Sequence, residues 1–261
     1  MFDFHLHSGV SFDSQESAEK IVEAAVKAGM KEICFTDHLD YEEVPTGIKV
    51  WFETDEYNAA YDHLCHKDLK IRKGFEFGML PDNQQTFLDD LQRRHFDFII
   101  GSVHFADGVD IFYEEFWKGR TPQAAELSYF ERILTCVKAH DSFDVLGHIT
   151  YIGKVLNNPN LRAVPLEEYR ELVDEIFRVV IQKGKGIEVN TSGFDRCGAF
   201  LPDEAYLRRF KELGGEIVTV GSDAHSFGRV GQYCHEACRL VSDIFGYVCT
   251  FEDRKPIFHK I

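Results

Sequence analysis

Seven short apolar segments, separated by longer segments of helical character, limit the fold of this chain more than any other feature. They are residues 2–7, 32–38, 69–77, 96–104, 143–148, 186–192 and 216–225. Each has the length of a strand that is buried on both faces. Strands that alternate with helices indicate parallel βα units, and a closed barrel is the simplest way to bury every strand. We therefore predict an α/β fold with seven strands in one barrel.

The segments between these runs predict the helices. Residues 14–29 carry an apolar stripe at three- and four-residue steps, with Ser14 as the expected N-cap and Gly29 just past the end. Residues 165–184 and 202–214 follow the same pattern, and each also ends at a glycine. Weaker helical patterns cover residues 53–68, 83–94 and 122–140.

The charge balance restricts the partners of the chain. Its 261 residues include 29 Lys and Arg against 44 Asp and Glu, which gives a net charge of −15. So strong an acidic excess argues against binding nucleic acid or an anionic membrane surface. A small anionic substrate stays compatible, because bound metal ions can reverse the charge locally. No linker-like stretch or internal repeat divides the sequence, so we expect residues 1–261 to form one domain.

The sequence also indicates the cellular compartment of the protein. The N-terminal residues show no secretory pattern, and no apolar run approaches the ~20 residues needed to span a bilayer. Seven cysteines without a CxxC motif favour free thiols in a reducing environment. We therefore expect a cytoplasmic protein.

Residues of the types that bind metal ions gather at the C-terminal ends of six of the seven predicted strands. They are His5, His7, Asp37, His38, Glu76, His104, His148, Asp223 and His225. In a parallel barrel these strand ends converge on one mouth, and residues i and i+2 point to the same side. Carboxylates and imidazoles packed together need a cation, and this set of nitrogen and oxygen ligands suits Zn²⁺, Fe²⁺ or Mn²⁺. Each motif alone would also fit polar residues at a solvated rim, but their joint recurrence favours a metal site.

These motifs, in this order, resemble those of the polymerase-and-histidinol-phosphatase (PHP) superfamily. The matching stretches are HLHSGVSFDS, TDH, GFEFG, GSVH, GH and GSDAH. Four more resemble the monofunctional histidinol-phosphate phosphatase branch: FDVLGHITYIGKV, IEVNTSGF, ELGGEIVTVGSDAH and FEDRKPIFHKI. The resemblance covers nearly the whole chain. It implies a distorted (β/α)₇ TIM-like barrel, the PHP fold, that carries up to three divalent metal ions.

The resemblance also implies a ligand set for three ions, which we expect to be zinc, iron or manganese. It assigns His5, His7, Glu76 and Asp223 to the first metal, Glu76, His104 and His148 to the second, and Asp13, His38 and His225 to the third. The activity implied is hydrolysis of L-histidinol phosphate to L-histidinol and phosphate in histidine biosynthesis. We hypothesise that a hydroxide bridging the two metals that share Glu76 attacks phosphorus, and that Asp223 or His225 protonates the leaving group.

Residues on the predicted loops are candidates for binding the substrate. They are Arg162, Arg196, Arg229 and Ser102. An arginine could hold the phosphate with two hydrogen bonds or form a surface ion pair, and we favour Arg162 and Arg196 because they lie on long loops. Ser102 would contact the substrate or satisfy backbone groups at its strand end. Asp40 and Glu42 could bind a substrate amine or simply face solvent.

Three alternatives stay open from the sequence. The first is a phosphoesterase of the same class that acts on another small monoester, such as a sugar phosphate or phosphotyrosine. The second is a regulatory module that binds metal ions without turnover. The third, a nuclease or proofreading role, fits the acidic charge poorly. The expected partner is therefore a small phosphorylated substrate, with no nucleic acid and no membrane, while the oligomeric state stays open.

Overall fold

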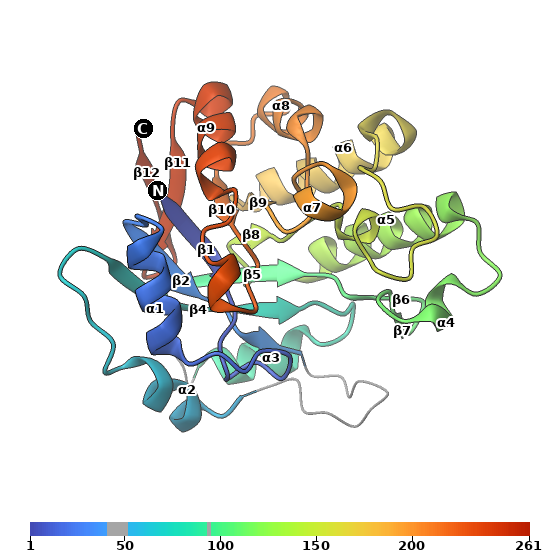
Figure 1. Ribbon diagram of the computed structural model, residues 1–261. Helices are drawn as coiled ribbons and strands as arrows, with labels where there is room; N and C mark the ends of the chain where they lie inside the picture. The colour runs from blue at the N-terminus through green and yellow to red at the C-terminus, as the bar shows by residue number, and fades with distance from the viewer. Residues whose placement is uncertain (41–51, 93–94) are drawn as a thin grey trace.

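Parallel strands curve nearly into a closed barrel at the centre of the computed structural model, which describes residues 1–40, 52–92 and 95–261 (Figure 1). The sheet runs in the order β1 (Phe2–Leu6), β2 (Glu32–Phe35), β4 (Lys70–Gly78), β5 (Phe98–Ser102), β8 (Val145–Leu146), β9 (Gly186–Asn190) and β10 (Val218–Gly221). All neighbouring strands on this path pair in parallel. A short strand β3 (His38–Leu39) also pairs with β4. Each predicted apolar segment overlaps one of these strands, and the predicted (β/α)₇ fold is confirmed.

The barrel closes between its first and last strands by a short contact. Leu6 forms an isolated parallel bridge with Ala224. The backbone N–H of His7 donates to the Ala224 carbonyl at 3.0 Å, and the N–H of Asp223 donates to the His5 carbonyl at 2.8 Å. This seam brings the residues after β10 directly beside the residues after β1.

Helices surround the sheet, and each predicted helical segment contains one (Figure 1). They are α1 (Ala18–Lys27), α2 (Thr54–Tyr61), α3 (Gln84–Leu91), α5 (Pro122–Ala139), α6 (Leu166–Gln182) and α8 (Glu204–Glu212). The connections also contain α4 (Glu114–Trp117), α7 (Phe194–Cys197) and α9 (Cys234–Phe245). Among the described residues, no helix combines the length and the apolar character that crossing a membrane requires.

The predicted N-cap of the first helix is wrong. Ser17 occupies that position and accepts a hydrogen bond from the N–H of Lys20, so the helix begins at Ala18. The Ser14 hydroxyl instead donates to the His225 carbonyl at 3.1 Å, because the preceding loop folds over the barrel mouth. Gly29 does follow the helix end, with φ +74°.

Two hairpins lie at opposite ends of the barrel, and the sequence analysis did not predict either. Strands β6 (Phe105–Ala106) and β7 (Val109–Asp110) follow the C-terminal end of β5. Strands β11 (Val248–Glu252) and β12 (Lys255–His259) cover the other end, to the left in Figure 1. There Arg254 donates from its backbone N–H to the Asp97 carbonyl at 2.9 Å and from its guanidinium to Asp144 at 2.5 Å. The β11–β12 hairpin therefore closes the N-terminal end, and the C-terminal end stays open.

Candidate active site

The nine residues expected to bind metal ions meet at the open, C-terminal end of the barrel. They are His5, His7, Asp13, His38, Glu76, His104, His148, Asp223 and His225, which lie on β1, β3 and β4 or in the loops after β1, β5, β8 and β10. Asp40 lies beside His38 and His104 in the same cluster. The parallel order of the strands explains the convergence, since their C-terminal ends all face the same mouth. The structure thus brings together the full ligand set that the sequence resemblance implies.

Glu76 lies at the centre of this cluster and is fully buried. Its Oε2 faces His5 Nε2 at 3.2 Å, His7 Nε2 at 3.6 Å and His38 Nδ1 at 3.1 Å. Its Oε1 faces His104 Nε2 at 3.3 Å and His148 Nε2 at 2.7 Å. The two carboxylate oxygens therefore serve two different groups of histidines, which is the geometry of a carboxylate that bridges two cations.

Asp223 lies beside His5 and His7, two of the histidines that face Glu76 Oε2. It reaches them from the loop after β10, across the contact between β1 and β10. Its Oδ1 lies 3.4 Å from His7 Nε2 and 3.7 Å from His5 Nε2. Its backbone has φ +55°, an uncommon conformation for a residue with a side chain. The hydrogen bond to the His5 carbonyl holds this conformation and aims the carboxylate at the histidines.

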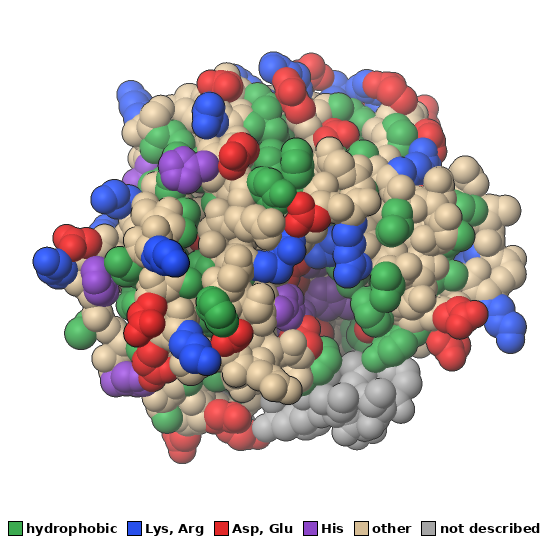
Figure 2. Space-filling view, viewed as in Figure 1, with side chains coloured by type: hydrophobic (Ala, Val, Ile, Leu, Met, Phe, Trp, Pro, Cys, Tyr) green, Lys and Arg blue, Asp and Glu red, His purple; other side chains and the backbone are tan. Residues whose placement is uncertain are grey.

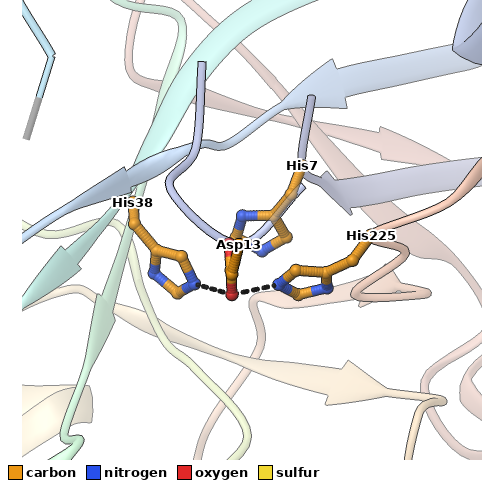
Figure 3. A group of neighbouring side chains, drawn as sticks. All are labelled: His7, Asp13, His38 and His225. Atoms are coloured by element: carbon orange, nitrogen blue, oxygen red, sulfur yellow. Dashed lines mark ion pairs between the residues drawn. The ribbon is translucent and has the colours of Figure 1, made fainter. Parts of the chain in front are cut away.

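Asp13 forms the centre of a third group (Figure 3). Its Oδ2 lies between two imidazoles, 2.9 Å from His225 Nε2 and 3.5 Å from His38 Nε2. The ring of His7 stacks on His225 with 4.1 Å between centroids. One ligand atom from each of these four residues lies within 4.8 Å of the others.

The charges of the cluster are strongly coupled. Burial disfavours the charged form of Glu76, but His5 and His38 outweigh it and hold the pKa of the carboxyl well below its usual range. Burial likewise opposes charge on His38, yet Glu76 and Asp13 raise the pKa of that imidazole to about 9. At His7, burial and the neighbouring imidazoles act together and lower the pKa to about 3. His7 is therefore neutral, as a metal ligand must be.

The polar atoms inside the cluster fit divalent cations. Three of the buried imidazole nitrogens that face Glu76, namely His5 Nε2, His7 Nε2 and His38 Nδ1, have no hydrogen-bond partner among the described residues. Buried polar atoms without partners are costly, and a cation between them and the carboxylates would satisfy both. The ligands are nitrogen and oxygen only, as expected for Zn²⁺, Fe²⁺ or Mn²⁺.

Buried partners orient the histidines from behind. His5 Nδ1 lies 2.6 Å from Glu188 Oε1, and Glu188 Oε2 accepts the backbone N–H of His148 at 2.9 Å. His104 Nδ1 lies 3.3 Å from Asp40. Such outer contacts fix which ring nitrogen faces a metal. The sequence analysis missed Glu188, although a glutamate inside the buried strand β9 was the available signal.

The cluster opens into a cleft of about 560 Å³. Figure 2 shows histidine side chains at the bottom of a hollow, with Lys and Arg side chains above it and hydrophobic side chains to its right. Of the residues that the structure describes, the cations on the cleft wall are Lys154, Arg196 and Arg229. The aromatic residues on the wall are Phe12, Phe105, Phe112, Tyr113 and Tyr151. The cleft thus has a cationic part and an aromatic part around the metal-binding atoms.

Two of the expected substrate-binding residues do not reach the cleft wall. Arg162 turns away, and its guanidinium pairs with Glu126 and Glu168, each at 2.8 Å. Ser102 is fully buried below the site, with its hydroxyl 3.4 Å from His148 Nε2. The roles of Arg162 and Ser102 in binding the substrate therefore stay predictions.

Other predicted residues lie on the cleft wall, and one residue there was missed. Arg196 lines the cleft, and Asp40 lines it while paired with His104. Glu42 lies outside the described residues. Lys154 was missed, although it follows β8 closely in the sequence. Its ammonium group lies 2.8 Å from Asp223 Oδ2 and also contacts the Ser192 hydroxyl.

Comparisons with known proteins agree with this geometry. The PHP domain family model matches residues 3–192. The chain is 30% identical to the histidinol-phosphatase of Lactococcus lactis subsp. lactis over 97% of this chain and 95% of that protein. It is 28% identical to a "Probable histidinol-phosphatase" of Clostridium acetobutylicum, covering 100% and 97% of the two chains. The crystal structure of the L. lactis histidinol phosphate phosphatase with zinc, L-histidinol and phosphate superposes with a TM-score of 0.87, at 28% identity and 98% coverage of each chain.

Proposed function

This chain belongs to the PHP domain family, and from that premise we propose that it is a metal-dependent phosphatase that hydrolyses L-histidinol phosphate to L-histidinol and phosphate. The observation that carries the proposal is the position of Glu76, whose two carboxylate oxygens face separate groups of histidines. This arrangement is suited to a pair of divalent ions that together act on one phosphate. The similarity to a phosphatase bound to zinc, L-histidinol and phosphate supports the substrate, and with it a role in histidine biosynthesis.

Three ligand groups support a site for three divalent ions. The first is His5, His7, Glu76 and Asp223, the second Glu76, His104 and His148, and the third Asp13, His38 and His225. When bound, the ions would neutralise phosphate oxygens and lower the pKa of a coordinated water, which makes it a nucleophile at neutral pH. Zinc, iron and manganese all suit this ligand set, and the zinc of the L. lactis structure supports zinc among them.

The side chains of this chain would position the phosphate and handle the proton. Lys154 and Arg196 present positive charge to the cleft and would bind phosphate oxygens. Asp223 and His225 also line the cleft, and one of them would return a proton to the leaving oxygen of L-histidinol. The hydrogen bonds from Lys154 and Ser192 fix the Asp223 carboxylate for this role, at 2.8 and 3.1 Å.

Release of inorganic phosphate from a panel of monoesters tests the proposal. We expect the protein, loaded with Mn²⁺ or Zn²⁺, to hydrolyse L-histidinol phosphate with a higher kcat/KM than fructose bisphosphate or phosphotyrosine. Substituting Glu76→Gln should lower kcat by at least about 1000-fold and reduce the metal content, because the bridging carboxylate is removed. A better kcat/KM for another monoester would refute the substrate, whereas full activity and metal content in Glu76→Gln would refute the metal assignment.

A further inference from the structure

Among the described residues, the cleft wall contains one carboxylate that has no part in the proposed chemistry and no ion-pair partner. Six acidic residues in the described part of the chain line the cleft: Asp13, Asp40, Glu76, Asp110, Asp195 and Asp223. Five of them are paired within the protein: Asp13 and Glu76 with histidines, Asp40 with His104, Asp195 with Arg229, and Asp223 with Lys154. Among the described residues, Asp110 alone of the six forms no ion pair. Its side chain accepts one hydrogen bond, from the N–H of Phe112 at 2.8 Å.

Asp110 is held firmly at this position. It ends β7 and pairs with Phe105, the residue after His104. The next residue, Ile111, donates its N–H to the His104 carbonyl at 2.9 Å and accepts the Trp117 indole N–H at 2.8 Å. The Phe112 carbonyl accepts from the Asn157 amide at 2.6 Å. The carboxylate therefore belongs to a tethered segment of the wall, beside a proposed metal ligand.

The surroundings of Asp110 suit the end of a substrate that carries no phosphate. Its neighbours on the wall are aromatic and include Phe105, Phe112 and Tyr113. Burial raises the pKa of the Asp110 carboxyl, although the Phe112 N–H and His104 oppose this effect. A partly buried carboxylate without a cation is costly, and a bound cation removes that cost. Lys154 and Arg196 supply positive charge for the phosphate, so the cleft can complement both ends of a zwitterionic monoester.

We propose that Asp110 determines specificity by accepting the protonated amine of the substrate, while the aromatic residues of the same wall contact its imidazole. This inference rests on the proposed function, since L-histidinol phosphate has a phosphate at one end and an ammonium group and an imidazole toward the other. The charge on Asp110 would favour such amino alcohol phosphates over neutral monoesters. The proposed metal ligands alone cannot make this distinction, because they act on the phosphate.

The variant Asp110→Asn tests the role of the charge. Asparagine keeps the oxygen that accepts from Phe112 and removes only the negative charge. We expect kcat/KM for L-histidinol phosphate to fall by about 10- to 100-fold, as for a lost charge-assisted hydrogen bond. For p-nitrophenyl phosphate, and for an analogue of L-histidinol phosphate without the amine, kcat/KM should change by less than about twofold. The inhibition constant of L-histidinol should rise, while that of inorganic phosphate should not.

Asp107→Asn provides a matched control, because Asp107 lies in the same hairpin but is exposed and paired with Arg120 at 2.6 Å. It removes the same charge, and its φ of +52° tolerates asparagine. We expect its kcat/KM to stay near that of the wild type for every substrate.

Each outcome separates the inference from the proposed function. If the wild-type protein does not hydrolyse L-histidinol phosphate, the proposed function fails, and the inference fails with it. If the wild type is active but Asp110→Asn lowers kcat/KM equally for all substrates, or for none, only the role of Asp110 is overturned. An equal loss on the analogue without the amine would overturn the assignment to the amine. Loss of folding would lower the apparent kcat equally for every substrate and leave the inhibition constants unchanged, which also counts against the inference.

Discussion

Lys154 and Arg162 belong to the same connection after β8, yet they face different surroundings. Lys154 lines the cleft and contacts Asp223, with 13% of its side chain exposed. Arg162 faces away, toward Glu126, whose side chain is fully buried. One cation is therefore available to a phosphate in the cleft, whereas the other neutralises a carboxylate of α5.

These positions predict opposite effects of two glutamine substitutions. Lys154→Gln should lower kcat/KM for L-histidinol phosphate by about 10- to 100-fold, because a charged contact to phosphate is lost. Its melting temperature with metal bound should stay near that of the wild type. Arg162→Gln should keep kcat/KM within about threefold and destabilise the fold by about 2 kcal/mol, because Glu126 loses a buried partner. Enzyme kinetics and thermal unfolding of both variants check this, and the reverse pattern would return Arg162 to the substrate.

The proposed metal ligands could be predicted from the sequence, whereas the cations around them could not. A ligand such as His104 directly follows a buried strand, so its position follows from the parallel sheet. Arg162 and Lys154 lie on a long connection whose path depends on tertiary contacts. Buried Glu126, in α5, determines that path, and no local pattern pairs it with Arg162.

Strands β1 and β10 meet at the only seam of the sheet where pairing is reduced to one bridge, as far as the described residues show. A buried carboxylate, Asp3, strengthens this seam. It accepts hydrogen bonds from the Ser222 N–H at 2.8 Å, the Ser222 hydroxyl at 2.6 Å and the Gly231 N–H at 2.8 Å. Asp3 thereby connects β1 to the loop that carries Asp223.

Substituting Asp3→Asn should weaken the seam. An amide offers one acceptor oxygen and turns the other side into a donor, so at least one of the three donors loses its partner. We expect a loss of about 2–3 kcal/mol and a melting temperature lower by about 6 °C. The control is Asp203→Asn at the N-cap of α8, where asparagine caps as well as aspartate. Calorimetry that gave the two variants the same melting temperature would argue against the role of Asp3.

At the scale of elements, the alternating pattern predicted the seven strands of the barrel and six of the helices, but neither the two hairpins nor α4, α7 and α9. The β11–β12 turn has positive φ at Asp253 and Arg254, positions where Asn and Gly are the usual signal. In β6 and β7 only two residues pair on each strand, too few for a periodic pattern. The N-cap of α1 could not be predicted from a local pattern either, because Ser14 and Ser17 are equally good N-cap residues by sequence. Only the tertiary contact of Ser14 with the His225 carbonyl, at the mouth of the barrel, shows that Ser17 is the cap.

The whole molecule is acidic, with a net charge of −15, while its cleft is arranged for a phosphate. Three ions would contribute six positive charges against the three carboxylates Asp13, Glu76 and Asp223. The metal-binding cluster would therefore carry a net charge of +3. On the rest of the described cleft wall, Lys154, Arg196 and Arg229 balance Asp40, Asp110 and Asp195. The acidic surface disfavours long polyanions, but a single phosphate monoester would meet a local positive charge.

This charge balance predicts how the stability of the protein depends on metal ions and pH. In the metal-free protein Glu76 and Asp13 raise the pKa of His38 from 6.5 to about 9, against the effect of burial. The stabilisation from that charged pair is complete below pH 6.5 and is lost as the pH rises through 9. Metal binding requires neutral His38, so protons compete with the ion over the same range.

The increase in melting temperature on adding Mn²⁺ to chelator-treated protein should therefore grow as the pH is raised from 6.5 toward 9. An ion present at 100 times its dissociation constant stabilises the folded state by about 2.7 kcal/mol per site. Glu76→Gln should lose most of this increase, whereas His63→Gln should keep it, because His63 lies at the surface beside Glu19. Differential scanning calorimetry at several pH values measures the effect. An increase that shrinks with rising pH, or that survives in Glu76→Gln, would contradict the assignment of Glu76 and His38 as metal ligands.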